Sequence, residues 1–123
     1  MVIRHEIFTV ATEERLQFMD LTKRMRDILQ RHEVKQGLLI VNSLHTTTAL
    51  FINEWQEALL HDIQLLLDRL IKEQEGYRHN DPQYSDCDRS NADSHLRSLL
   101  LGRQLSIPVV NGEMSLGTFE SII

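Results

Sequence analysis

The dipeptide Asn111-Gly112 constrains the fold most, because it is the strongest short sequence signal for a tight β-hairpin. It lies between two runs with strand character, residues 105–110 and 114–119. Two-residue hairpin turns need positive φ angles, which Asn and Gly adopt at low cost. Pro108 in the first run favours an edge strand or a bulge. The C-terminal part of the chain is therefore expected to form antiparallel strands.

Hydrophobic periodicity predicts the remaining elements. The first two strands are expected to pair as a hairpin, and β-branched residues or short apolar runs mark the others. The expected strands are residues 2–10, 15–19, 38–41 (buried) and 46–52. Helices are expected to follow capping residues at Asp20 or Thr22, at Asn53, and at Ser90 or Asn91. The order β-β-α-β-β-α-α-β-β predicts an α+β fold with mostly antiparallel pairing.

Length and composition bound the class of protein. A chain of 123 residues that is 41% hydrophobic and 25% charged is expected to form one globular domain spanning residues 1–123. The single cysteine, Cys87, allows no internal disulfide and favours a reducing compartment. Without a signal peptide or an apolar run of ~20 residues, a cytoplasmic protein away from membranes is expected. The net charge of −5 disfavours nucleic-acid binding but leaves room for a small anionic ligand.

Six histidines are the best lead to a site, although they form no local motif. His45, His79 and His95 lie at element ends or in the polar loop 74–89, where functional sites are usually built. These three are candidate metal ligands if folding brings them together. The alternative is that each is a separate, solvated polar residue. The other three have ordinary surface interpretations: His5, His32 and His61.

Three neutral imidazoles would suit a divalent metal, Zn²⁺ first and Mg²⁺ as an alternative, and would leave an open fourth position. Four side chains could orient the rings as hydrogen-bond acceptors: Asp62, Asp88, Asn53 and Asn91. Glu54 could act as a general base, or could simply be a charge in the first turn of a helix. The candidate catalytic residues are Glu54, Asp62 and Asp88. The candidate substrate-binding residues are Asn53, Asn80, Asn91, Thr46 and Thr47.

Four sequence blocks follow one another in order and cover nearly the whole chain. The blocks are Gly37 to Glu54 with His45-Thr-Thr and Ile52-Asn-Glu; Tyr77-Arg-His-Asn80; Asp88-Arg-Ser-Asn91-Ala-Asp-Ser-His95-Leu with Leu101-Gly; and Ile107-Pro with Gly112 and Leu116-Gly-Thr-Phe. Each block alone is weak, but together they are specific and resemble the YjbQ family.

The resemblance implies a small β-sandwich flanked by helices, a homotrimer, and a metal site at His45, His79 and His95. It also implies a secondary thiamine-phosphate synthase activity, which joins a pyrimidine pyrophosphate to a thiazole phosphate. The enzyme could instead be a metal-dependent hydrolase of a small phosphorylated substrate. The non-enzymatic alternatives are a metal- or metabolite-binding trimer and a purely structural trimer. The possible phosphate partners are Arg78, Arg89, Arg97 and Arg103.

The chain departs from the family pattern near its end. Phe119-Glu120 stands where the family usually has an aromatic residue followed by Gln. The family also continues beyond this point with a strand and a segment of Asp-Gly-Pro-Arg type. The domain is therefore expected to lack the usual C-terminal strand, and a neighbouring subunit is expected to cover Ile122 and Ile123.

Overall fold

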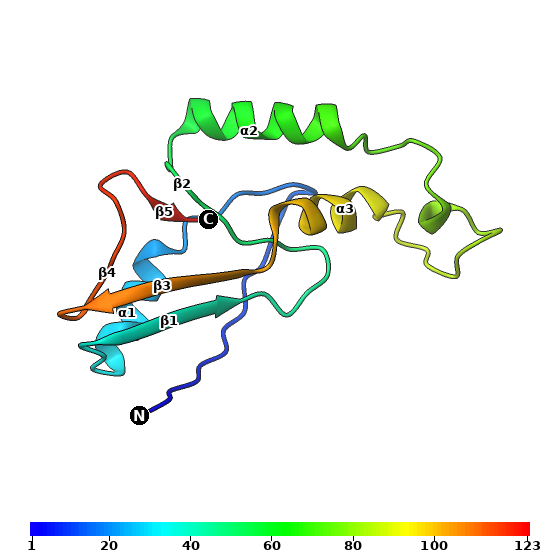
Figure 1. Ribbon diagram of the computed structural model, residues 1–123. Helices are drawn as coiled ribbons and strands as arrows, with labels where there is room; N and C mark the ends of the chain where they lie inside the picture. The colour runs from blue at the N-terminus through cyan, green and yellow to red at the C-terminus, as the bar shows by residue number, and fades with distance from the viewer.

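The structure, a computed structural model, covers residues 1–123 and contains helices on the flanks of two small sheets (Figure 1). The helices are α1 (Thr22–Arg31), α2 (Glu57–Leu70) and α3 (Ala92–Leu101), with a 3-10 turn, η1, at Arg78–Asn80. The strands are β1 (Gly37–Asn42), β2 (Ile52–Asn53), β3 (Gln104–Val110), β4 (Glu113–Met114) and β5 (Ser121–Ile122). The sheets have the orders β1-β3-β4 and β2-β5, and all pairs are antiparallel. The predicted α+β class is confirmed.

The hairpin predicted at Asn111-Gly112 is present and joins β3 to β4. The φ angles are 52° at Asn111 and 81° at Gly112, both positive as the turn requires. β3 also pairs with β1 along the whole of β1. The Pro108 carbonyl accepts a hydrogen bond of 2.8 Å from Ser115 N. Ser115 lies just beyond the end of β4, so Pro108 faces that side of β3. Because β4 does not reach Pro108, the missing N–H of the proline costs no strand–strand hydrogen bond.

The core lies between α1 and the two sheets. Its buried centre combines Met25 of α1, Val41 of β1, Ile107 of β3, Leu50 and Ile122. Since both sheets contribute to one apolar cluster, burial of these side chains holds the sheets and α1 together. The strand predicted at 38–41 is present as part of β1, but it is not buried on both faces. Its side chains alternate, with Val41 inside and two others facing outward: Leu38 and Ile40.

The C-terminal residues Ile122 and Ile123 are buried within this chain, so the expectation that a neighbouring subunit must cover them is wrong. Phe51 and Ile123 exchange backbone hydrogen bonds of 2.9 Å in both directions. Ile122 N donates to Thr22 Oγ1 at 2.9 Å, and Ile122 O accepts from Leu21 N at 2.8 Å. The last residues therefore fasten the start of α1 to the segment that enters β2.

The N-terminal strands predicted at 2–10 and 15–19 are not formed. Residues 1–20 make no backbone–backbone hydrogen bond. Side chains anchor the segment to α1 instead: Glu6 contacts Arg31 at 2.6 Å and His32 at 2.9 Å. Arg24 also lies over the Phe8 ring, 4.7 Å from its centroid. Strand propensity describes fit to a pleated neighbour, and this segment has no strand beside it.

The strand predicted at 46–52 is also wrong for most of its length, because only Ile52 lies in β2. The Ser43 and Thr48 hydroxyls contact each other and turn the chain instead. Short hydroxyl side chains bond to their own backbone and so compete with a strand ladder. Asn53 does not cap α2. The cap is Gln56, whose Oε1 accepts from Leu59 N at 2.8 Å.

Helix α3 has the predicted limits, with Asn91 at its N-cap and Gly102 at its C-cap. In Figure 1, α2 runs along one side of the molecule, and the long connection through η1 returns the chain to α3. No helix combines the length and the apolarity that crossing a membrane would need.

Candidate functional site

Two of the three predicted histidines, His79 and His95, lie side by side. Their ring centroids are 4.8 Å apart and the rings meet edge to face at 83°. His79 comes from η1 in the long loop, and His95 from the start of α3. Both side chains are half-buried. The fold therefore joins two histidines that are separated in sequence into one local pair.

Asn91 orients the His79 ring. His79 Nε2 lies 3.2 Å from Asn91 Oδ1. An amide oxygen can only accept, so Nε2 carries the proton and the Nδ1 lone pair of His79 stays available. The Cys87 thiol donates to the same oxygen at 3.9 Å. Asn91 was a candidate both for orienting a histidine ring and for binding substrate, and here its side-chain oxygen contacts His79.

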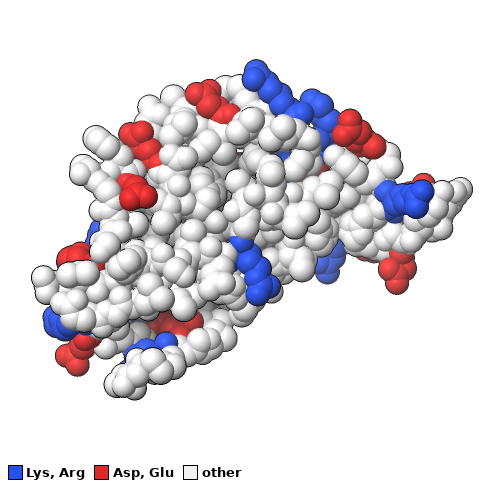
Figure 2. Space-filling model, viewed as in Figure 1, with Lys and Arg blue, Asp and Glu red and all other residues white.

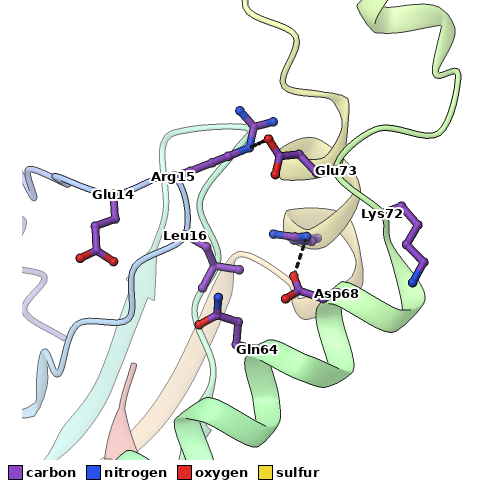
Figure 3. Close-up of a pocket in the computed structure, with 8 residues that line it drawn as sticks. Glu14, Arg15, Leu16, Gln64, Asp68, Lys72 and Glu73 are labelled. Carbon is purple, nitrogen blue, oxygen red and sulfur yellow. Dashed lines mark hydrogen bonds and ion pairs between the residues drawn. The ribbon is translucent and has the colours of Figure 1, made fainter.

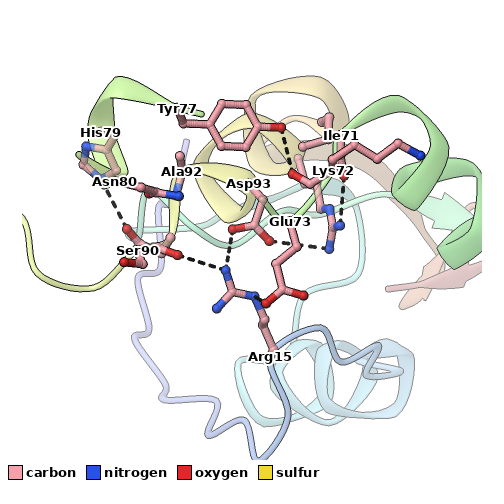
Figure 4. Close-up of polar contacts among 12 residues, drawn as sticks. Arg15, Ile71, Lys72, Glu73, Tyr77, His79, Asn80, Ser90, Ala92 and Asp93 are labelled. Carbon is pink, nitrogen blue, oxygen red and sulfur yellow. Dashed lines mark hydrogen bonds and ion pairs between the residues drawn. The ribbon is translucent and has the colours of Figure 1, made fainter. Parts of the chain in front are cut away.

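Asn80 fixes η1 against α3. Its Oδ1 accepts a hydrogen bond of 3.0 Å from Ala92 N at the start of α3 (Figure 4). The Asn80 side chain therefore caps α3, although Asn91 is the residue at the N-cap position. The Asn80 Nδ2 group is buried without a partner. This contact holds the turn that carries His79 next to the helix that carries His95, and it explains why the pair is preorganised.

A buried ion network lies beneath the same end of α3. Asp93 is 0% exposed. Arg15 Nη2 donates to Asp93 Oδ1 at 2.6 Å and to Ser90 O at 3.0 Å. Arg97, whose side chain is 13% exposed, contacts Asp68 at 3.0 Å and donates to Ile71 O at 3.1 Å. Arg97 was a candidate phosphate partner, but its guanidinium group is bonded to Asp68 of α2 and to Ile71 at the C-terminal end of that helix.

Sequence reasoning missed this network because each member looks like an ordinary surface charge. The only available signal was Asp93 in the first turn of an otherwise amphipathic helix. Tyr77 borders the same region and donates its hydroxyl proton to Lys72 O at 2.7 Å. Burial raises the pKa of Tyr77, and the negative charges of Glu75 and Asp93 raise it further.

A cavity of about 540 Å³ opens between the N-terminal segment, α2 and Arg97 (Figure 3). Its lining is almost entirely polar: Glu14, Arg15, Leu16, Gln64, Asp68, Lys72, Glu73 and Arg97. The cations and carboxylates are equal in number, and two of the cations already pair with acids. Of the candidate site residues, only Arg97 lines this cavity. The cavity is therefore a weak candidate for binding an anion.

His45 does not join the pair. It is exposed in the loop after β1, where its Nδ1 lies 3.2 Å from Thr47 N and 2.8 Å from Thr47 Oγ1. No group of three His, Cys, Asp or Glu side chains in this chain lies close enough together to hold a metal ion. The metal triad expected from His45, His79 and His95 is thus not assembled within one chain.

The other candidates are dispersed. Glu54, Asn53 and Thr46 are exposed around the segment that leads to α2. Asp62 is exposed on α2, where His61 Nδ1 lies 3.6 Å from its Oδ1. Asp88 is exposed in the long loop and makes no hydrogen bond or ion pair within the chain. The residues that do converge are His79, His95, Asn80 and Asn91.

Comparisons with known proteins agree with this architecture. Residues 6–123 match the family described as UPF0047 protein YjbQ-like. A UPF0047 protein of Methanothermobacter thermautotrophicus is 38% identical over 121 residues, which are 95% of this chain and 80% of that relative. One from Archaeoglobus fulgidus is 37% identical over 115 residues, 94% of this chain and 84% of the relative.

Solved structures are similar as well. A hypothetical protein of Aeropyrum pernix K1 superposes with a TM-score of 0.83 at 37% identity, covering 94% of this chain and 81% of that one. A conserved YjbQ/UPF0047 protein of Clostridium acetobutylicum gives a TM-score of 0.80 at 26% identity, with coverage of 92% and 82%. The chain belongs to the YjbQ family, as its sequence blocks predicted.

Proposed function

We propose that this protein is a metal-assisted enzyme acting on a small phosphorylated molecule, with His79 and His95 holding a divalent ion. The observation that carries the proposal is the edge-to-face pair, in which Asn91 fixes one ring and leaves its Nδ1 lone pair free. Imidazole nitrogens are common Zn²⁺ ligands, whereas Mg²⁺ prefers oxygen, so Zn²⁺ is the ion proposed.

The donor set fits part of a zinc site. Catalytic zinc usually has three protein ligands and one open position. Two histidines leave the remaining positions to water, to substrate or to a side chain of a neighbouring copy. A bound ion would supply a Lewis acid for a phosphoryl oxygen or acidify a water molecule. The contribution of this chain is the fixed ring orientation from Asn91 and the fixed loop position from Asn80.

The family resemblance supports one reaction in particular, the joining of a pyrimidine pyrophosphate to a thiazole phosphate with release of pyrophosphate. Negative charge builds up on the leaving pyrophosphate, so cations without partners would favour the reaction. Arg89 and Arg103 make no ion pair, whereas Arg78 stacks on Tyr84 at 4.8 Å. The alternative proposal is a non-catalytic module that holds a metal or metabolite without turnover.

We also propose that the active form is a homotrimer. The outer face of the β1-β3 sheet is apolar, with Leu38 58%, Ile40 55% and Val110 50% exposed. Contiguous apolar surface of this kind is typical of an interaction site. Only 11 of the 123 residues are buried in the isolated chain, so much apolar surface remains for an interface.

Metal analysis of the purified protein tests the proposal, followed by calorimetric titration with Zn²⁺ and a screen of phosphorylated substrates. His79→Ala and His95→Ala should each abolish most zinc binding and any turnover that depends on it. His61→Ala is the matched control, because His61 is exposed on α2 beside Asp62. Zinc binding without turnover would favour the non-catalytic module. Zinc binding that survives both substitutions would reject the site.

A further inference from the structure

The loop after β1 fixes the proton of His45. The Thr47 backbone N–H points at His45 Nδ1 with an N···N distance of 3.2 Å. A backbone N–H can only donate, so Nδ1 must accept and carries no proton. The Thr47 hydroxyl lies 2.8 Å from the same nitrogen, where it also donates. The proton of the neutral ring therefore sits on Nε2.

We infer that His45 is a hydrogen-bond donor to a phosphate oxygen and not a metal ligand. A histidine that binds a metal through Nε2 needs a free lone pair there and usually donates from Nδ1 to a neighbour. His45 has the opposite arrangement, since its neighbour occupies Nδ1. Its Nε2–H makes no hydrogen bond within the chain, and the side chain is exposed. The group left to a ligand is a fixed N–H donor.

The surroundings of His45 favour an anion. The Thr46 N–H and hydroxyl are exposed and make no hydrogen bond within the chain. Ser43 N donates to Arg103 O at 2.9 Å, which places Arg103 at the same end of the β1-β3 pair. The Arg103 side chain is exposed and makes no ion pair. These groups together offer a cation and several hydrogen-bond donors.

The chain segments that form this end of the sheet carry no carboxylates. Residues 37–53 and 94–112 contain no Asp or Glu, although the chain has 18 acidic residues and a net charge of −5. Figure 2 shows a basic side chain with no acidic one beside it over the region where β1 ends and β3 begins. The local field therefore opposes the overall charge and attracts a negatively charged group.

Helix α3 connects this loop to the histidine pair. Ser98 Oγ donates to Thr48 O at 2.6 Å and thereby holds the loop against α3. His95 precedes Ser98 by three residues, which places both on one helix face, roughly 4.5 Å apart along the axis. The 43–48 loop thus serves as the phosphate subsite of the proposed enzyme, held against the helix that carries His95. The pairing of this subsite with a metal centre rests on the proposed function. The hydrogen-bonding chemistry of the 43–48 loop does not depend on it.

The proton position of His45 is tested first, by NMR of the imidazole nitrogens in metal-free, ¹⁵N-labelled protein. The spectrum of His45 should show the Nε2–H tautomer, with Nδ1 as the unprotonated nitrogen. Thr47→Val keeps the backbone N–H and should leave the tautomer unchanged. An Nδ1–H tautomer in the parent protein would overturn the inference.

Phosphate binding is tested next, with inorganic phosphate and pyrophosphate titrated into EDTA-treated protein. A hydrogen bond to a charged group implies at least about a tenfold loss of affinity in His45→Ala. His45→Gln offers an amide N–H in place of Nε2–H and should stay within about threefold of the parent. His61→Ala is the matched control and should not change the affinity. Circular dichroism and thermal melting check that every variant is folded.

The outcomes separate the two proposals. Zinc added to His45→Gln should bind as it does to the parent, because the variant keeps both metal ligands. Loss of zinc binding in His45→Gln, or equal phosphate affinity in His45→Ala and the parent, would overturn the phosphate subsite. If zinc fails to bind the parent protein, the metal-assisted function falls, whereas the tautomer and the phosphate titration still decide the role of His45.

Discussion

His79 and His95 meet edge to face with their ring centroids 4.8 Å apart, although sixteen positions separate them in the sequence. The contact depends on two asparagines: Asn80 ties η1 to the start of α3, and Asn91 orients the His79 ring. If this pair binds zinc, protons must compete with the ion, because only neutral imidazole is a ligand. Zinc affinity should then fall steeply between about pH 7 and 5. Calorimetric titration across that range measures it, and a pH-independent affinity would contradict histidine ligation.

Asn91→Ala removes the acceptor that fixes the His79 tautomer. Loss of such an orienting group should weaken metal binding by roughly 10- to 100-fold. The stability of α3 should change little, since the Asn91 side chain makes no capping hydrogen bond. Zinc titration together with thermal melting separates the two effects. Asn53→Ala, an exposed asparagine that contacts neither histidine, is the control and should keep full affinity.

Asp93→Ala should lower the free energy of unfolding by about 2–4 kcal/mol. The substitution removes the partner of Arg15 and leaves Arg97, which is mostly buried, with less compensation. Asp27→Ala breaks only the exposed pair with Lys23 and should cost about 0.5 kcal/mol or less. Urea denaturation of the two variants tests the difference. Equal stability of both would show that the network does not contribute to folding.

Tyr77 should titrate above the ordinary tyrosine pKa of 10.0, because burial disfavours the phenolate and Glu75 and Asp93 repel it. The folded state therefore holds this proton more tightly than the unfolded state. The contribution of Tyr77 to the free energy of unfolding is present below pH 10.0 and is lost as the pH rises through the pKa of Tyr77 in the folded state. Ultraviolet titration of phenolate absorbance checks this prediction. The raised titration step should vanish in Tyr77→Phe, and a step that persists belongs to another residue.

Ile40→Glu should break the proposed trimer, because it places a charge on the exposed apolar face of the β1-β3 sheet. Light scattering should show trimer for the parent and monomer for the variant at micromolar concentration. Gln30→Glu adds the same charge at an exposed position on α1, which covers the opposite face of the sheet, and should stay trimeric. A monomeric parent protein would rule out the trimer.

The sequence alone determined those helix ends and turns that depend on only a few neighbouring residues. The hairpin at Asn111-Gly112 formed because only a few residue types tolerate two consecutive positive φ angles. Helix α3 begins after Asn91 and has Gly102 at its C-cap, as predicted, although the Asn91 side chain makes no capping hydrogen bond. The family blocks likewise indicate the YjbQ family from the sequence alone, since several short motifs in fixed order are specific.

The tertiary structure determined the features that depend on contacts between distant segments of the chain. Residues 2–10 have strand propensity but formed no strand, because nothing lies beside them to complete a ladder. His79 and His95 converged while His45 stayed apart, because Asn80 docks the long loop on α3 and Thr47 holds His45 in its own loop. The burial of the Asp93 carboxylate could likewise not be predicted from the sequence, because it depends on a contact with a distant segment. A charge is buried only when a partner from another element reaches it, and here that partner is Arg15, 78 positions earlier in the chain.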